Sequence, residues 1–254
     1  MNNETGVETP PPAAVAPHKR YTRNSLALML GAGLVLGYVG ACGTTGTWLN
    51  GPTPNGQPTP APSETGWINL LDKENAKNWK NVTDDAEIFE IANNELHIFG
   101  KTLFPLRYVA YGDQTFSDFD LHIEYKVERK ANSGVFLRAH PDDPVVRGFE
   151  VQVLDDFGRP PNRHTSGAIY DVVSPMHNMS RPRGQWNSFD ISVVNKEISV
   201  RMNGWLVVTS DFGQMTEPLG KFKVPYTELP LEGLLALQDH GGEVWYRNIW
   251  IRKR

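Results

Sequence analysis

The chain has 254 residues, of which 39% are hydrophobic and 21% charged, so it can bury a core. Its net charge of −4, with no basic stripe, excludes nucleic acid as a partner. A single cysteine, Cys42, excludes an internal disulfide and any zinc site built from several cysteines.

Residues 1–41 indicate a targeting segment. A basic cluster at 18–23 precedes the apolar run Leu26–Val39, which has the length of a signal-peptide hydrophobic region rather than a membrane span. The run leads into Val-Gly-Ala before Cys42, which resembles the bacterial lipobox, where the cysteine is lipidated after cleavage. We therefore expect a lipoprotein anchored to the membrane at Cys42, in the periplasm or at the outer membrane of the cell envelope. An ordinary cleavage site or an uncleaved anchor is the alternative.

Residues 42–65 have the composition of a linker. They contain Pro-Thr-Pro twice and are rich in Gly, Thr and Ser, which is typical of an extended, semi-rigid spacer. We expect this segment to hold a single domain, residues 66–254, away from the membrane.

From Gly66 onward, apolar and polar residues alternate with a period of two. The clearest case is 119–127, where Phe, Leu, Ile, Tyr and Val alternate with charged residues. Asn-rich or Gly-containing pairs at 93–94, 195–196 and 203–204 indicate hairpin turns. No segment carries a useful helical stripe. The pattern predicts an all-β antiparallel sandwich or jelly roll, with one buried and one exposed face per strand.

Three polar stretches break this pattern, at 132–138, 149–155 with 165–170, and 237–242. In a strand over 149–154, Glu150 and Gln152 would share one face, and in a neighbouring strand Arg138 could lie on that face too. Polar groups that converge from three strands predict a concave, sugar-binding surface, and such breaks tend to mark functional sites.

The same stretches carry a family resemblance. The order N-S-G-x-x-x-R, F-E-V-Q-V-L-D, S-G-A-I-Y, W-N-S-F-D-I, L-Q-D-H-G and W-Y-R-N-I-W-I resembles the 3-keto-disaccharide hydrolase family, also described as 3-keto-glucoside lyase and 2-hydroxy-glucal hydratase. The resemblance covers nearly all of residues 66–254. It implies a concanavalin A-like sandwich, as in lectins and glucanases, and a 3-keto-glycoside as the carbohydrate substrate.

The implied reaction removes the C2 proton beside a C3 ketone, expels the group at C1 and adds water. It needs a base, a group that stabilises the enolate oxygen, and an acid. We expect Glu150 as the first acid/base candidate and His240 as the second, with Arg138 or a metal at the enolate oxygen. The residues expected to bind substrate or orient His240 are Asn132, Gln152, Tyr170, Gln238 and Asp239, and Tyr170 or Trp186 could stack on a sugar ring.

Other interpretations stay open. Glu150 and Arg138 could form a structural ion pair, and 239–242 could be a tight turn. No cofactor is evident; a divalent metal at Glu150, His240 or Asp155 stays open, because no spacing matches a metal signature. A noncatalytic carbohydrate-binding module is the alternative function. A two-carboxylate glucanase is disfavoured, because positions 150, 152 and 154 supply only one carboxylate.

Overall fold

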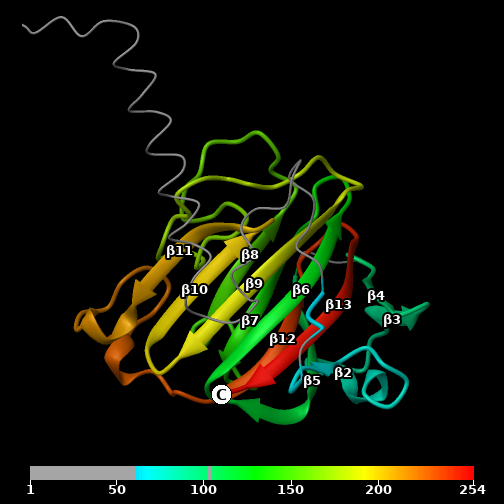
Figure 1. Cartoon of the computed structure of the whole chain (residues 1–254), viewed down its shortest axis with the longest axis horizontal. Coiled ribbons are helices and arrows are strands. Elements are labelled where there is room, and N and C mark those ends of the chain that lie inside the picture. The colour runs from blue at the N-terminus through cyan, green and yellow to red at the C-terminus, as the bar shows by residue number, and fades with distance from the viewer. Residues whose placement is uncertain (1–60, 64, 102–103) are drawn as a thin grey trace, which may run out of the picture. The chain divides into compact units, whose positions relative to one another are not determined.

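The described part of the chain, residues 61–63, 65–101 and 104–254 of a computed structural model, consists of β-strands joined by turns (Figure 1). Within it, 3-10 helices lie at Ala76–Asn78, Phe212–Gln214 and Tyr226–Glu228, and no α-helix occurs. The strands are β1 (Ile68–Asn69), β2 (Trp79–Asn81), β3 (Phe89–Ala92), β4 (Glu95–Ile98), β5 (Arg107–Phe116), β6 (Phe119–Val127), β7 (Asn132–Ala139), β8 (Phe149–Leu154), β9 (Trp186–Val194), β10 (Glu197–Met202), β11 (Trp205–Asp211), β12 (Gly233–Asp239) and β13 (Val244–Lys253).

The strands form two antiparallel sheets. The larger, eight-stranded sheet has the order β11-β10-β9-β6-β13-β4-β3, with β1 added to β13. The smaller, five-stranded sheet has the order β2-β5-β12-β7-β8. Neighbours in both sheets are often far apart in the sequence, as for β6 with β13 and β5 with β12. The fold class predicted from the sequence, an all-β antiparallel sandwich, is confirmed.

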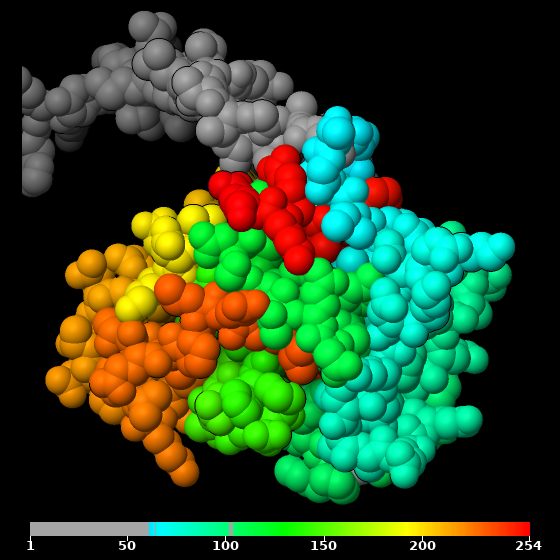
Figure 2. All heavy atoms as spheres, turned by 90° about the horizontal axis from the view of Figure 1, so that it is seen from below, coloured from blue at the N-terminus to red at the C-terminus, as the bar shows by residue number. Residues whose placement is uncertain are grey.

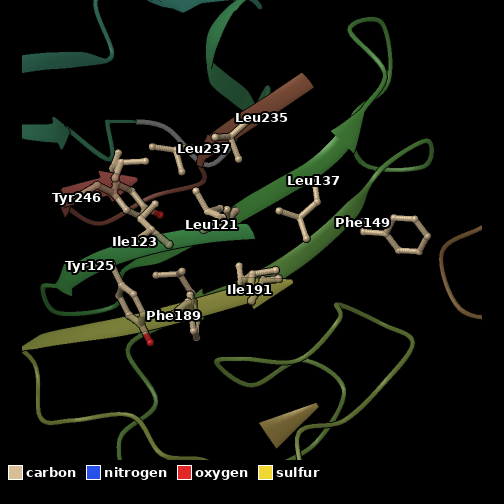
Figure 3. Packing of buried hydrophobic residues seen from close by; sticks show 14 of the residues in the cluster. Leu121, Ile123, Tyr125, Leu137, Phe149, Phe189, Ile191, Leu235, Leu237 and Tyr246 are labelled. Carbon is tan, nitrogen blue, oxygen red and sulfur yellow. The ribbon is translucent and has the colours of Figure 1, made fainter. Parts of the chain in front are cut away.

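The core consists of side chains from the facing surfaces of the two sheets (Figure 3). Leu121, Ile123 and Tyr125 of β6 are fully buried there, together with Leu235 and Leu237 of β12. These residues occupy alternate positions of their strands, as the period of two requires. The predicted inward face of 119–127 is therefore confirmed.

The three predicted hairpin turns are also confirmed. Asn93 and Asn94 join β3 to β4 with φ angles of 53° and 60°. Asn195 (φ 50°) begins the turn from β9 to β10, and Asn203 (φ 51°) the turn from β10 to β11. Asn tolerates this left-handed backbone region better than most residues, and it is common in the tight turns of hairpins.

The outer face of β6 differs from the exposed face that the alternation predicts. Asp120 and His122 are fully buried there, and Glu124 is 4% exposed. Arg252 Nη2 donates to Asp120 Oδ2 at 2.9 Å, and His122 Nδ1 lies 2.6 Å from Asp190 Oδ1. The expectation of a solvated face was wrong for this strand, because ion pairs replace water around its carboxylates.

The predicted signal peptide, Cys42 and most of the predicted linker lie outside the described residues. Among the residues that are described, no helix has both the length and the apolar character to cross a membrane.

Candidate active site

Glu150 lies on the outer face of the smaller sheet, in the position that strand alternation predicts. In β8, Val151 and Val153 are buried in the core between the sheets, so Glu150 and Gln152 face outward. In the neighbouring strand β7, Phe136 pairs with Glu150 and Gly134 pairs with Gln152. A Cβ atom at Gly134 would lie 2.7 Å from Glu150 Cγ, so the Glu150 side chain folds across the space that this glycine leaves open.

Glu150 is paired with a lysine that strand patterns do not indicate. Lys221 Nζ lies 3.5 Å from Glu150 Oε2, and the two side chains are 8% and 3% exposed. Burial raises the pKa of Glu150 to about 7, although Lys221 opposes the rise. Burial likewise lowers the pKa of Lys221. Burial thus disfavours the charged form of both groups, which eases proton transfer to and from them, as acid/base catalysis requires.

A row of polar side chains continues from Glu150 toward the end of β12. One end of the Gln152 side-chain amide lies 3.3 Å from Glu150 Oε1 and 2.8 Å from the Ser133 carbonyl oxygen. The amides of Gln152 and Asn132 approach within 3.3 Å. Asn132 Nδ2 in turn donates to His240 Nδ1 at 2.9 Å. The structure thus brings Glu150 and His240 onto one surface.

His240 is held in one neutral form by this contact. The Asn132 amide nitrogen can only donate, so Nδ1 of His240 accepts and the proton resides on Nε2. Burial lowers the pKa of His240, which also favours the neutral imidazole. The half-buried ring therefore offers an N–H donor rather than a cation.

Gln238 and Tyr170 also lie at this site. Gln238 is 4% exposed, and among the residues the structure describes its Oε1 has no hydrogen-bond partner. A buried acceptor without a partner is rare and is consistent with a place for a ligand hydroxyl. The half-buried Tyr170 donates its backbone N–H to the Glu150 carbonyl at 2.8 Å, and its ring centroid lies 5.7 Å from Lys221 Nζ.

An apolar cluster occupies the rest of this outer face. Phe136 is fully buried, and Tyr108 and Leu234 are nearly so. Val145 of the β7–β8 loop and Leu106 pack against this cluster. The polar row therefore lies beside an apolar cluster, and small-molecule sites combine these two kinds of group.

Arg138 does not join Glu150. Its backbone has a φ of 52°, which interrupts the regular extension of β7, and its side chain is directed to turns at the end of the larger sheet. Nε donates to the Ser117 carbonyl at 2.8 Å, Nη1 to the Asn195 carbonyl at 2.5 Å, and Nη2 to Asp118 Oδ1 at 2.9 Å. The expected place beside Glu150 is thus corrected: these contacts join the two sheets.

Two further expectations change. Asp239 alternates with Gln238 and lies on the opposite face of β12, where its Oδ1 accepts from the Gly241 N–H at 3.5 Å; Asn132 holds His240 instead. Trp186 lies in the larger sheet, with the Arg247 guanidinium 3.9 Å above its ring. Trp186 is therefore not part of this site.

The described residues contain no group of three or more His, Cys, Asp or Glu side chains that could hold a metal ion.

Sequence reasoning missed Lys221. It lies in the segment between β11 and β12, where Gly-Lys-Phe-Lys-Val-Pro has the appearance of an ordinary surface loop. Phe222 and Tyr226 of this segment pack against Phe149 of β8, with ring centroids 5.7 and 5.9 Å away. That packing places Lys221 Nζ over the Phe136 ring, 5.2 Å from the ring centroid. No local pattern could have indicated it.

Comparison with known proteins gives an independent finding. Residues 66–252 match the family described as "3-keto-alpha-glucoside-1,2-lyase-like domain". A curated relative, the "3-keto-disaccharide hydrolase" of Bacteroides thetaiotaomicron, is 28% identical over 170 residues, which are 54% of this chain and 59% of the relative. The chain thus spans about three-fifths of the length of that relative.

Solved structures show the same fold. A candidate glycosyl hydrolase from Parabacteroides distasonis superimposes with a TM-score of 0.63 at 24% identity, covering 74% of this chain and 99% of that one. A second from the same organism gives a TM-score of 0.58 at 26% identity, covering 75% and 84%.

Proposed function

This chain belongs to the family of 3-keto-alpha-glucoside-1,2-lyase-like domains, and on that premise we propose that it cleaves 3-keto-glycosides by elimination and hydration. The observation that carries the proposal is the buried Glu150–Lys221 pair on the outer face of the smaller sheet. A single carboxylate beside an amine suits removal of a proton next to a ketone. It does not supply the two carboxylates that ordinary glycosidases use.

Glu150 acts as the base. Its carboxylate takes the C2 proton, and the electron pair of that bond forms an enolate with its oxygen at C3. The pKa of about 7 makes the carboxylate a stronger base than an exposed glutamate while it remains partly ionised at neutral pH.

His240 and its neighbours bind the keto sugar. The Nε2–H of His240 donates to the oxygen at C3, where negative charge develops, and Asn132 fixes the ring through Nδ1. Gln238 Oε1 accepts a hydrogen bond from a sugar hydroxyl. In this way the polar row orients the ring so that C2 faces Glu150.

Lys221 acts as the acid. When the enolate collapses, the C3 ketone re-forms, a C1=C2 double bond appears and the C1–O bond breaks. The leaving oxygen takes a proton from the Lys221 ammonium group. Water then adds: its hydroxide bonds to C1, its proton returns to the Lys221 amine, and Glu150 returns its proton to C2.

Two matched lysine variants test this function. The full chain in detergent is mixed with a 3-keto-glucoside, and release of the group at C1 is followed by chromatography. We expect Lys221→Met to slow release by about 10²-fold or more, the effect of losing a general acid. Lys126→Met is the control, because Lys126 lies 4.9 Å over the Trp186 ring on the larger sheet. It should leave the rate unchanged.

The outcomes separate the functions. Equal rates for Lys221→Met and the unaltered chain would remove Lys221 from the mechanism. Saturable sugar binding by the unaltered chain without any release would favour a noncatalytic carbohydrate-binding module instead.

We further propose that the protein is anchored in the cell envelope by a lipid on Cys42. The support is the lipobox-like sequence alone, since Cys42 lies outside the described residues. Cys42→Ala should move the protein from the membrane fraction to the soluble fraction of a bacterial lysate. Unchanged membrane retention would contradict the anchor.

A further inference from the structure

A cavity of about 300 Å³ lies at the Gly233 end of the outer face of the smaller sheet. Thr115, Ala139 and Leu234 contribute to it from β5, β7 and β12, and His140 and Arg147 from the β7–β8 loop. Figure 2 views the molecule from the side where the β7–β8 loop (yellow-green) lies next to the orange segment that leads into β12. The volume is at the lower end of the range for small-molecule sites, about 300–1,000 Å³.

The cavity adjoins the apolar cluster that packs beside Glu150. Leu234 and Ala139 belong to the same apolar cluster as Phe136, the residue that pairs with Glu150. Ala139 lies three residues beyond Phe136 in β7, which is about 10 Å at about 3.3 Å per residue. His240 lies in the opposite direction, at the other end of β12. A substituent on a sugar held between His240 and Glu150 would therefore point toward the cavity.

The cavity offers hydrogen-bond donors on one wall. Arg147 is exposed at its rim and can donate through its guanidinium. His140 Nδ1 accepts from the Asp142 N–H at 3.2 Å, so the His140 proton resides on Nε2.

Acceptors and apolar surface complete the lining. Glu232, which accepts a hydrogen bond from Thr115 Oγ1, and Asp113 supply carboxylate oxygens. Pro141 and Pro230 supply flat apolar surface. Hydroxyl groups need both donors and acceptors, and the C–H face of a sugar ring packs on apolar groups. The carboxylates of Asp113 and Glu232 are balanced by the guanidinium groups of Arg138 and Arg147 in the same lining, so the formal charges cancel, which favours a neutral leaving group.

We propose that this cavity is the leaving-group subsite and that it takes the second sugar ring of a neutral 3-keto-disaccharide. The assignment rests on the proposed function and gives the substrate its direction: C3 lies toward His240, C2 over Glu150, and the group at C1 toward Arg147 and Glu232. Lys221, next to Glu150, then lies on the side of the bond that breaks.

The test compares two substrates. One is a 3-keto-disaccharide, and the other is the methyl 3-keto-glucoside of the same configuration, whose leaving group cannot reach the cavity. In the full chain, Arg147→Ala/Glu232→Ala removes two exposed side chains from the cavity wall. We expect the ratio of kcat/KM for the disaccharide to that for the methyl glucoside to fall about 10- to 100-fold, the loss of two hydrogen bonds of ordinary strength from solvent-exposed side chains.

The matched control is Arg183→Ala/Glu197→Ala, which removes the same two residue types from exposed positions outside the cavity, Glu197 being in the larger sheet. For this control, the ratio of kcat/KM for the disaccharide to that for the methyl glucoside should equal the ratio of the unaltered chain. If the unaltered chain cleaves both substrates but the Arg147/Glu232 variant keeps the same ratio, the subsite is overturned and the proposed function stands. If the unaltered chain cleaves neither substrate, the proposed function fails, and this assignment fails with it.

Discussion

Each sheet has a buried glutamate on its outer face, Glu124 on the larger sheet and Glu150 on the smaller. The pKa values of these two carboxylates shift in opposite directions. On the larger sheet, Glu124 accepts from Arg247 Nε at 2.7 Å and from Asn248 Nδ2 at 2.8 Å. Burial alone would raise the pKa of Glu124, but these partners and His122 outweigh it and lower the pKa. On the smaller sheet, Glu150 faces Lys221 at 3.5 Å, and burial prevails, so the pKa rises to about 7.

The difference lies in how completely hydrogen bonds replace water around each charge. A buried charge is tolerated when its lone pairs are fully used, and such a group is inert. A buried charge whose partners lie at longer distances, as Lys221 does from Glu150 at 3.5 Å, stays nearer the point of changing its protonation state. Burial by itself therefore does not mark the reactive carboxylate; incomplete pairing does.

Exchanging each glutamate for glutamine gives the largest expected contrast. Glu150→Gln should lower kcat for a 3-keto-glycoside by about 10²- to 10⁴-fold, because the amide cannot take the C2 proton. Glu124→Gln should leave kcat per folded molecule unchanged and lower the free energy of unfolding by about 1–3 kcal/mol, since Arg247 loses its charged partner. Measurements of kcat and of the free energy of unfolding in urea, made on both variants, check these two expectations. Loss of activity in Glu124→Gln without loss of stability would break the comparison.

The pH dependence of stability gives the next effect. Burial lowers the pKa of His122, but Asp190 and Glu124 outweigh it and raise the pKa to about 9. In an unfolded chain the pKa is about 6.5, so the imidazolium stabilises the fold fully below that pH and its contribution disappears as pH rises through 9. We expect the free energy of unfolding to fall by about 2–3 kcal/mol between pH 7 and pH 10.

Urea unfolding at the two pH values measures this change. His122→Gln is the reference variant, because it lacks the titrating group and should lose most of the dependence. An equal fall in the variant would assign the effect to other groups.

Gly134→Ala tests whether the position of the Glu150 carboxylate on the smaller sheet matters for the rate. A Cβ there would lie 2.7 Å from Glu150 Cγ, so the carboxylate must move. We expect kcat to fall about 10-fold, since a displacement of about 1 Å at a reacting group can cost up to 10²-fold. In the Glu150→Gln background, the same substitution should have no further effect on kcat. Additive losses in the double variant would show that Gly134 acts independently of Glu150.

The smallest effect is a shift in the pH–rate profile. Because Glu150 must be ionised to act as a base, kcat/KM should fall below a pH of about 7, the pKa raised by burial. Lys221 opposes that rise, so Lys221→Met should move the residual acid limb about one unit or more to higher pH. A limb that stays in place would mean that another group titrates.

Strand alternation gave the right face for Glu150, Gln152 and Gln238, because residue parity holds along any regularly extended segment. It failed at Arg138, where the left-handed φ of 52° breaks that regularity. It also failed for the outer side chains of β6. Alternation separates the two faces of a strand, but it does not say what covers each one.

Local sequence patterns were enough to predict the strands, their inward faces and the hairpin turns, since these depend on neighbours within a few residues along the chain. Its motif order also indicated the family. Tertiary structure decided which polar groups meet: Lys221 reaches Glu150 because Phe222 and Tyr226 of its segment pack against Phe149, more than 70 residues earlier. Pairing between such distant residues, and the desolvation that raises the pKa of Glu150, arise only when the whole sandwich is assembled.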